Sequence, residues 1–320
     1  MTKIINRESI EKSIDFPELI NQIEKYYQKL NSGKVGVTSR IFTDTKDGGK
    51  YIIGGATNFE NESFIVMSQP VMPWYAEEGL PVATTSYIYS SFRTGEIKAI
   101  VGGADLVKYR TPAKSALAAK YLAPKKTSYT LGLIGLGVQA VTHTEAFSKL
   151  FNITKILGTS RHPEKWQKNI DEIELKTNLK LELTDIDKLV ERSDIVVVIT
   201  SATQPLVKFS MLHKGQLVIG TDHAETVAKD VALNAEKVFV DYRPTAENEP
   251  ATIRMLLEEG HAYEEIVDGD LLQLTGGALP GRESEDEIIF FQSLGVLNEN
   301  LAAVEYLYDK LKNEAEEIVF

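Results

Sequence analysis

The sequence contains no cysteine, which excludes disulfides, thiolate metal sites and cysteine nucleophiles together. Histidine is also scarce, and the spacing of the five residues does not match HExxH or a similar metal motif: His143, His162, His213, His223 and His261. We therefore expect no metal site. No apolar run approaches the roughly 18 residues of a membrane span, and residues 1–8 become polar too early for a signal peptide. A cytoplasmic location is expected.

The chain has fewer basic than acidic residues. The chain has 35 Lys and Arg against 46 Asp and Glu, a formal net charge of −11. Nucleic acids and anionic membranes need a positive surface, so neither is expected as the main partner, and a small-molecule substrate is. With 43% hydrophobic and 25% charged residues in 320, the chain has the balance of a folded globular protein and the length of two domains.

The N-terminal third changes from a helical to a strand pattern. Apolar residues recur at helical spacing between Leu19 and Leu30. Between residues 35 and 103, the segments 51–53, 64–67 and 85–89 are rich in β-branched and aromatic residues and are separated by glycines. This pattern predicts an antiparallel or mixed sheet.

A second helix is expected after this sheet. Thr111 can serve as its N-cap, with Pro112 at the first helical position, where a missing N–H costs nothing. The Ala-rich stretch 114–122 is a good helix former. Pro124 closes it, and residues 125–128 read as a linker. We therefore place the domain boundary at 125/126.

From residue 126 onward, short apolar runs alternate with helical stretches. The runs lie at 131–134, 155–157, 179–183, 195–199, 217–219 and 238–240. Several are apolar on both faces, which is typical of a parallel sheet covered by helices. The predicted fold class is α/β, with a doubly wound Rossmann domain following an α+β domain.

The segment Gly135-Leu136-Gly137-Val138-Gln139-Ala140 fits the pattern G-x-G-x-x-(G/A). It follows an apolar strand and opens a helix over 138–150, and a second strand lies about 20 residues on, which is the context that the motif requires. Gly135 permits the tight turn, and Gly137 lets the backbone approach a pyrophosphate. The free amides of Val138 and Gln139 at the helix N-terminus would hold the phosphates. A nicotinamide dinucleotide is the expected cofactor.

The end of the second strand indicates which nicotinamide cofactor is preferred. An acidic residue there would bind the ribose hydroxyls of NAD, but the chain has Gly158-Thr159-Ser160-Arg161-His162. Arg161 can pair with a 2′-phosphate and Ser160 can donate a hydrogen bond to it. NADP(H) is favoured and NAD(H) remains possible, because Arg161 could also be a solvated loop residue. His162, Thr200 and Ser293 are further expected cofactor contacts.

These motifs together resemble the ornithine cyclodeaminase/mu-crystallin family. The matching stretches, in order, are Gly79-Leu80-Pro81, Thr94-Gly95-Glu96, 110–119, 135–140, Gly220-Thr221-Asp222, 281–288 and Ser293-Leu294-Gly295. The resemblance implies a substrate-binding and dimerisation domain (1–125), a Rossmann domain (126–290) and a C-terminal helix (291–320) that returns to the first. A homodimer is expected.

The resemblance also implies site residues. Arg40 would hold a substrate carboxylate through a bidentate pair, and Arg110, placed just before a helix N-terminus, would make a second anion site. Thr111 would contact the cofactor. Asp222 lies at the carboxyl end of a predicted parallel strand. It matches the aspartate with which cyclodeaminases contact the substrate amine. The alternatives are a surface salt bridge for Arg40 and capping for Thr111 and Asp222.

One departure concerns the family's catalytic lysine. Many members carry it at the start of a strand that leads to a proline, and here Phe64 takes that place in 64–70. Phe64 is then expected to contact the substrate. Lys114 occupies a position that is usually small and apolar in the family. It could be a relocated catalytic amine, but a solvated helix lysine is the favoured interpretation.

Most family members exchange hydride between nicotinamide and a carbon that bears an amine or imine. Our first hypothesis is thus an NAD(P)H-dependent oxidoreductase acting on the C–N centre of a small carboxylate-bearing substrate, with reduction faster than oxidation. A cyclodeaminase that recycles its cofactor and a ligand-binding protein of mu-crystallin type remain alternatives. The sequence does not name the substrate.

Overall fold

The computed structural model describes all residues except 77, 79, 81–82, 222–223 and 320. The chain forms two compact units: a first unit of residues 1–110 and 296–320, and a second unit of residues 111–295. The division falls inside a helix rather than in the linker at 125–128, and residues 291–295 belong to the second unit. The assignment of separate substrate and cofactor roles to two domains stays a prediction.

The first unit is built on a mixed sheet, as expected. Among the described residues its order is β16-β1-β7-β6-β5-β4-β2, with β3 also paired to β4. Only the β1·β7 pair is parallel in this part of the chain. The strands are β1 (Thr2–Ile5), β2 (Val35–Val37), β3 (Ile41–Asp44), β4 (Lys50–Asn58), β5 (Ser63–Val71), β6 (Ser86–Ser91), β7 (Ile97–Gly102) and β16 (Glu316–Ile318). Its helices are α1 (Arg7–Ser13), α2 (Phe16–Asn31), the 3-10 helix η1 (Pro73–Ala76) and α12 (Leu297–Leu311).

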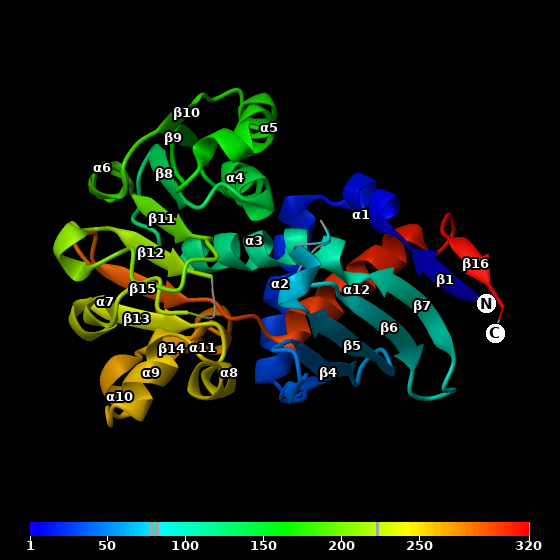
Figure 1. The fold of residues 1–320 in the computed structure, drawn as a ribbon. Coiled ribbons are helices and arrows are strands. Elements are labelled where there is room, and N and C mark those ends of the chain that lie inside the picture. The colour runs from blue at the N-terminus through cyan, green and yellow to red at the C-terminus, as the bar shows by residue number, and fades with distance from the viewer. Residues whose placement is uncertain (77, 79, 81–82, 222–223, 320) are drawn as a thin grey trace. The chain divides into compact units, whose positions relative to one another are not determined.

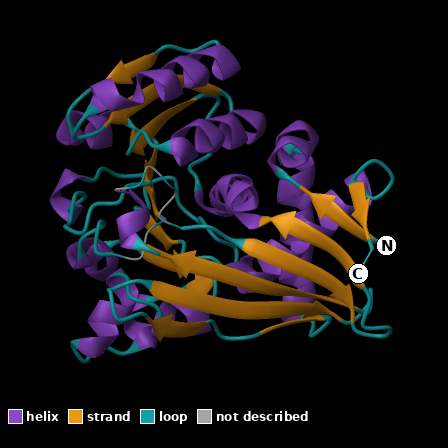
Figure 2. Cartoon of the chain, turned by 45° about the vertical axis from the view of Figure 1, so that its right-hand side comes forward, coloured by secondary structure: helices purple, strands orange, loops and turns teal. Residues whose placement is uncertain are grey.

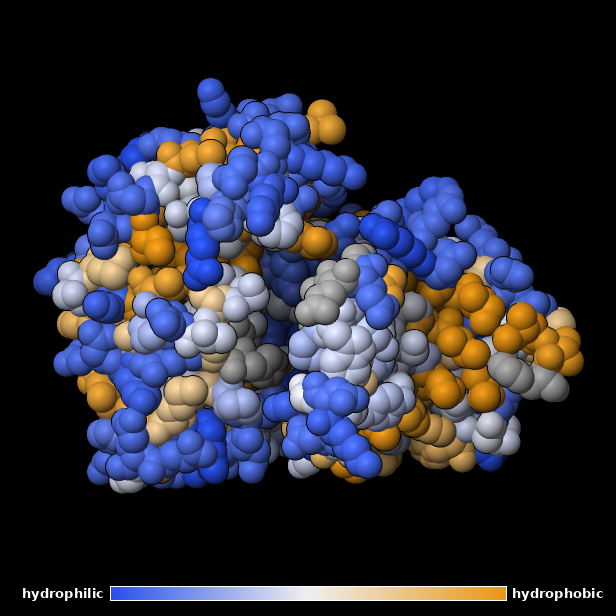
Figure 3. Space-filling view, viewed as in Figure 1, coloured by the Kyte–Doolittle hydropathy of each residue, from blue (hydrophilic) through white to orange (hydrophobic). Residues whose placement is uncertain are grey.

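The two faces of this sheet differ in character because side chains alternate along each strand. The inner face, which carries α12, buries Ile52, Ile65 and Tyr87. The outer face leaves apolar side chains exposed, among them Val66 and Ile88. Figure 2 shows the long strands of this sheet, and Figure 3 shows apolar side chains gathered over the first unit.

The C-terminal helix α12 is tied to the sheet by one buried carboxylate. Glu305 accepts hydrogen bonds from five side chains of α2, β4, β5, β6 and the β4–β5 turn: Tyr26, Asn58, Asn61, Ser63 and Tyr89. A buried charge is tolerated where several donors solvate it. Residues separated by more than 200 positions are thereby held together in one core.

Local capping explains where the helix at 19–30 begins. Asp15 is the N-cap of α2, and its side chain accepts a hydrogen bond from the backbone N–H of Glu18. Pro17 lies in the first turn, where its missing N–H leaves no intrahelical bond unmade. The helix then buries the apolar stripe that its spacing predicted, from Leu19 to Tyr27.

The start of the next helix was predicted wrongly. Helix α3 spans Gly103–Leu122, so Pro112 lies inside it and Thr111 is not an N-cap. The Thr-Pro pair is a start signal only when nothing helical precedes it. Here the residues from Gly103 already form two turns, with Leu106 fully buried, and tertiary burial outweighs the cost of an internal proline.

The second unit is built on a parallel sheet, ordered β10-β9-β8-β11-β12-β15-β13-β14 in the described part of the chain. Its strands are β8 (Tyr129–Ile134), β9 (Ile153–Thr159), β10 (Leu181–Leu183), β11 (Ile195–Val198), β12 (Leu217–Gly220), β13 (Lys237–Val240), β14 (Gly269–Asp270) and β15 (Ile289–Gln292). The strand order reverses between β8 and β11, which is where doubly wound sheets bind ligands. The Rossmann fold class is confirmed.

Helices follow most of these strands, as Figure 1 shows. They are α4 (Val138–Leu150), α5 (Gln167–Thr177), α6 (Ile186–Arg192), α7 (Lys229–Asn234), α8 (Arg243–Asn248), α9 (Thr252–Glu258), α10 (Tyr263–Ile266) and α11 (Leu271–Thr275), with the 3-10 helices η2 (Pro163–Trp166) and η3 (Phe209–Met211). None of the helices in the described part of the chain is long and apolar enough to span a membrane.

Candidate functional site

A cavity of about 750 Å³ opens in the second unit at the carboxyl ends of β8, β9 and β11. This volume suits a cofactor-sized ligand. Its lining includes eight of the expected cofactor residues: Gly135, Gly137, Val138, Gln139, Ser160, Arg161, His162 and Thr200. The structure therefore brings residues from three loops to the switch point of the sheet.

The glycine loop has the geometry that a bound pyrophosphate needs. Gly135 has φ +109°, and a Cβ there would lie 2.4 Å from the carbonyl oxygen of Ile199, so both the conformation and the space require glycine. Gly137 is the N-cap of α4 and makes no side-chain cap, which leaves the first amides of the helix open to a ligand. A Cβ on Gly137 would meet nothing nearer than Trp166, at 4.0 Å.

The charge of this cavity comes from the loop after β9. Arg161 and Lys165 both line it, and no Asp or Glu does among the described residues. Lys165 is a second cation that the sequence argument missed, although it lies only four residues beyond Arg161. A nucleotide with an extra phosphate on its ribose would meet positive charge here and no repelling carboxylate among the lining residues that the structure describes.

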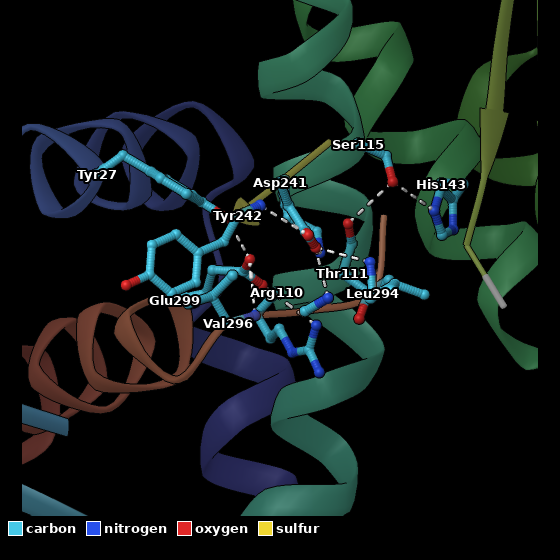
Figure 4. Close-up of polar contacts among 12 residues, drawn as sticks. Tyr27, Arg110, Thr111, Ser115, His143, Asp241, Tyr242, Leu294, Val296 and Glu299 are labelled. Carbon is cyan, nitrogen blue, oxygen red and sulfur yellow. Dashed lines mark hydrogen bonds and ion pairs between the residues drawn. The ribbon is translucent and has the colours of Figure 1, made fainter. Parts of the chain in front are cut away.

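The first unit holds a second charged cluster, around Arg110. Its Nη1 lies 3.2 Å from Oε2 of Glu299, whose other oxygen accepts from the Tyr27 hydroxyl at 2.5 Å and from the Val296 backbone N–H at 3.1 Å (Figure 4). Glu299 is fully buried and Arg110 nearly so. The carboxylate therefore fixes one end of the guanidinium.

The sequence suggests that Arg110 stands just before a helix N-terminus, and this prediction is wrong. Arg110 lies in the eighth position of α3, counting from Gly103, so no helix dipole reinforces its charge at that point. Its anion-binding capacity comes from the guanidinium itself. Within the described residues its Nε has no hydrogen-bond partner although it is buried, so one donor remains to be satisfied.

Arg40, just before β3, is half-buried. Its Cγ lies 3.5 Å from where a Cβ on Gly54 would stand, which places its stem over the inner face of β4. Burial raises the pKa of the Tyr87 hydroxyl to about 12, and the charges of Arg110 and Arg40 both oppose that shift. The two arginines therefore approach the same buried group from different elements.

Phe64 is not on this inner face. It is registered with Thr57 on β4 and Ser90 on β6, whereas Tyr87 is registered with Met67. An odd separation along a strand puts Phe64 and Met67 on opposite faces, so the expected substrate contact of Phe64 is not supported. The inner-face positions of β5 are Ser63, Ile65, Met67, Gln69 and Val71, so this strand offers no lysine there either.

Lys114 is neither solvated nor a free amine. Its side chain is 1% exposed, and its Nζ lies 2.7 Å from Oδ2 of Asp241, which is itself fully buried. The same oxygen accepts from the backbone N–H groups of Leu294 (2.7 Å) and Gly295 (2.5 Å), and the other oxygen accepts from Tyr242 N–H (Figure 4). Although burial opposes ionisation, the charge of Lys114 and these donors keep the pKa of Asp241 below its ordinary value.

His143 connects α4 to α3. Its Nδ1 lies 2.8 Å from the Gln139 carbonyl and its Nε2 lies 3.2 Å from the Ser115 hydroxyl. The carbonyl can only accept, so Nδ1 donates to it, and in the neutral ring Nε2 accepts from the Ser115 hydroxyl. Burial, aided by the nearby charge of Lys114, lowers the pKa of His143 to about 4. The ring is a structural link beneath the glycine loop.

Two of the expected cofactor contacts are not in the cavity lining. Thr111 and Ser293 are nearly buried and lie outside the set that lines it. The Ser293 hydroxyl has no partner in the described part of the chain. Asp222 lies outside the described residues, so its predicted role stays a prediction. Among those residues, no group of three or more His, Asp or Glu could hold a metal ion.

Sequence reasoning missed Glu299, Tyr87, Asp241, Lys165 and Trp166. Nothing in the sequence near Arg110 points to Glu299, because the two are 189 positions apart. The strand alternation of β6 could have indicated that Tyr87 faces inward. The buried position of Asp241 could have been suspected from the apolar run 238–240 before it.

The family model for the ornithine cyclodeaminase/mu-crystallin family matches residues 1–315. The chain belongs to this family. The alanine dehydrogenase of Archaeoglobus fulgidus is 26% identical over 324 residues, covering all of this chain and 98% of the relative. The iminosuccinate reductase of Paracoccus denitrificans is 32% identical over 230 residues, which cover 69% and 68%.

A solved structure extends this comparison. The Δ1-pyrroline-2-carboxylate reductase of Thermococcus litoralis, in complex with NADH and L-proline, superposes with a TM-score of 0.93 at 27% identity, covering 99% of this chain and all of that one. The relatives are oxidoreductases that act on C–N centres with a nicotinamide dinucleotide. This confirms the reaction class and the cofactor class that the sequence predicted, and it leaves the choice between NAD and NADP open.

Proposed function

We propose that this protein is an NADPH-preferring reductase of a small α-imino acid. The observation that carries the substrate class is the approach of two arginines, Arg40 and Arg110, to one buried point on the inner face of the first sheet. Two cations there match a carboxylate. The reductive direction follows from the strand β5, which offers no amine on its inner face to take a proton from an amino acid.

The chemistry is hydride addition to the carbon of a C=N bond, with one proton ending on nitrogen. The nicotinamide supplies the hydride when it is bound. The glycine loop of Gly135 and Gly137 would hold the pyrophosphate, and Arg110 and Arg40 would orient the carboxylate. An iminium that is already protonated needs orientation and hydride only, so the absence of a general acid on β5 is no obstacle to reduction.

The preference for NADPH is supported by Arg161 and Lys165, the two cations in a lining without carboxylates among the described residues. Each contact to a 2′-phosphate would contribute about 1.5 kcal/mol, the lower end for a charged hydrogen bond because both side chains are exposed. NADPH should bind at least about tenfold more tightly than NADH. In the double variant Arg161→Ala/Lys165→Ala the two dissociation constants should converge.

The activity is tested by following NADPH oxidation with Δ1-pyrroline-2-carboxylate, and with 2-methyl-1-pyrroline as a matched imine that lacks the carboxylate. Turnover of the first substrate only is expected, and Arg110→Ala should remove it. L-Ornithine with NAD tests the cyclodeaminase alternative. Release of ammonia from ornithine, or turnover of neither imine, would reject the proposal.

We also propose that the protein is a homodimer joined through the outer face of the first sheet. Ile41 is 63% exposed, Ile53 40%, Val66 38% and Ile88 41%, and large apolar side chains exposed together on one face of a sheet often mark a protein–protein interface. The double variant Val66→Lys/Ile88→Lys should sediment as a monomer. A wild type that sediments as a monomer at micromolar concentration would refute this.

A further inference from the structure

The hydroxyl of Tyr87 is one of the buried polar atoms of the first unit that have no hydrogen-bond partner among the described residues. Tyr87 is 0% exposed, and within the described residues its oxygen has no hydrogen-bond partner. Native proteins pair almost all buried polar atoms, so an unpaired one that is retained calls for a reason. A phenylalanine would fill the same space without the unpaired group.

The register of the sheet shows what lies around this hydroxyl. Gly54 on β4, Met67 on β5, Tyr87 on β6 and Val101 on β7 form one row of cross-strand partners, and such partners share a face. A Cβ on Gly54 would lie 2.6 Å from Leu297 of α12 and 3.5 Å from Arg40 Cγ. Arg40 therefore lies on the face of Tyr87, two strands or roughly 10 Å along the row.

Helix α3 approaches Tyr87 from the β7 end of this row, opposite to the end at which Arg40 lies. It begins at Gly103, where a Cβ would lie 2.6 Å from Cε2 of Tyr87. Two turns later the helix presents Arg110, whose buried Nε is unpaired in the described part of the chain while its Nη1 is held by Glu299. Two unpaired buried donors and two positive charges thus belong to one neighbourhood.

The ionisation of these groups decides what ligand they can take. Burial raises the pKa of Tyr87 to about 12, although Arg110 and Arg40 oppose the shift. The hydroxyl is therefore a protonated donor at neutral pH and a poor acid. A carboxylate has two oxygens with about four acceptor positions, enough for both arginines and one further donor.

We propose that Tyr87 is a specificity-determining residue, whose hydroxyl donates a hydrogen bond to the substrate carboxylate held by Arg40 and Arg110. The inference rests on the proposed function for the identity of the anion. What it adds is that the hydroxyl of Tyr87, on β6, is a third and neutral donor that completes the anion site. The free protein then keeps an unsatisfied hydroxyl that only the ligand satisfies.

The test is Tyr87→Phe, with Tyr89→Phe as the matched control. Tyr89 lies on the same strand and face, but its hydroxyl already bonds to Glu305. Binding of pyrrole-2-carboxylate, a planar probe of the carboxylate, is measured by calorimetry, and the kinetics of Δ1-pyrroline-2-carboxylate reduction are measured with NADPH. For Tyr87→Phe we expect the Kd and KM to rise about ten- to a hundredfold with kcat nearly unchanged. Pyrrole, which lacks the carboxylate, should bind the wild type and Tyr87→Phe alike.

Although Tyr87→Phe should weaken binding of the probe, it should not lower the thermal stability of the free protein. Without a ligand, Tyr87→Phe should melt at the same temperature as the wild type or higher, because it removes an unpaired buried hydroxyl. A lower Tm would mean that the hydroxyl has a partner in the free protein and would overturn the proposal. Unchanged Kd and KM would also overturn it, as would a fall in kcat with unchanged KM and an altered pH profile, which would make Tyr87 a proton donor.

The two proposals fail separately. If the wild type binds pyrrole-2-carboxylate in a Tyr87-dependent manner but reduces no imine, the reductase assignment fails and the anion site stands. If it reduces imines but Tyr87→Phe changes nothing, only the role of Tyr87 fails. A wild type that does not bind the probe at millimolar concentration refutes the anion site.

Discussion

The pair formed by Lys114 and Asp241 allows a sharp prediction, because its two members are solvated unequally. In Lys114→Met, Asp241 keeps the three backbone N–H donors of Tyr242, Leu294 and Gly295. In Asp241→Leu, those three donors lose their bonds to this carboxylate and Lys114 loses its ion pair with Asp241. Breaking a buried ion pair costs about 3–5 kcal/mol. We therefore expect Lys114→Met to lower the free energy of unfolding by about 3 kcal/mol or less, and Asp241→Leu to lower it by about 5 kcal/mol or more.

The chain provides a reporter for this comparison. It has two tryptophans, Trp74 in the first unit and Trp166 in the second, so Trp74→Phe leaves a single fluorophore in the unit that holds the pair. Urea unfolding in that background, followed by the fluorescence of Trp166, gives the free energy for each variant. The difference should be about 2 kcal/mol, which would move the midpoint by roughly 1 M for a slope of about 2 kcal/mol/M.

Two results would refute this reasoning. Equal losses, or a larger loss for Lys114→Met, would show that the backbone donors do not stabilise Asp241 as described. Turnover abolished in a folded Lys114→Met protein that still binds NADPH would show that the amine is catalytic, the relocated-lysine interpretation raised from the sequence.

Two further predictions follow from buried groups. Because the pKa of His143 is lowered to about 4 in the fold and is ordinarily about 6.5, its unfolded form takes up a proton that the folded form refuses. The stability should therefore fall between pH 6.5 and 4 by up to about 3 kcal/mol, and His143→Gln should flatten that slope in urea unfolding at pH 7 and pH 4.5. Replacing Glu305 by Gln leaves one oxygen for five donors and should cost about 3 kcal/mol. Glu305→Leu should cost more, and a melting curve like the wild type's would contradict both.

Local signals accounted for the features that the sequence predicted well. Helix α4 begins and ends at the predicted residues 138 and 150, because a glycine turn and an apolar strand fix its start within a few positions. The parallel sheet followed from runs of residues that are apolar on both faces. The lining of the cavity followed for the same reason, since the ends of consecutive parallel strands meet at one edge.

The errors have a common physical origin in contacts distant along the chain. Lys114 looked solvated because its partner Asp241 is 127 positions away. Pro112 looked like a helix start because the turn before it is stabilised by burial rather than by propensity. Phe64 was placed by its distance from a proline, and only the register of β4, β5 and β6 decides the face on which it lies.

The return of helix α12 to the first sheet has a consequence during synthesis. The second unit is one continuous stretch, 111–295, whereas the first needs both residues 1–110 and residues 296–320. At about 5–20 residues per second, a ribosome adds the intervening 185 residues in roughly 10–40 s. During that interval α12 does not cover the inner face of the first sheet, and the five donors that bond to Glu305 lack this carboxylate. The first unit therefore starts to be synthesised first but can complete its fold only after the second unit has been made. A chaperone that protects the first unit would have to remain bound until α12 emerges from the ribosome.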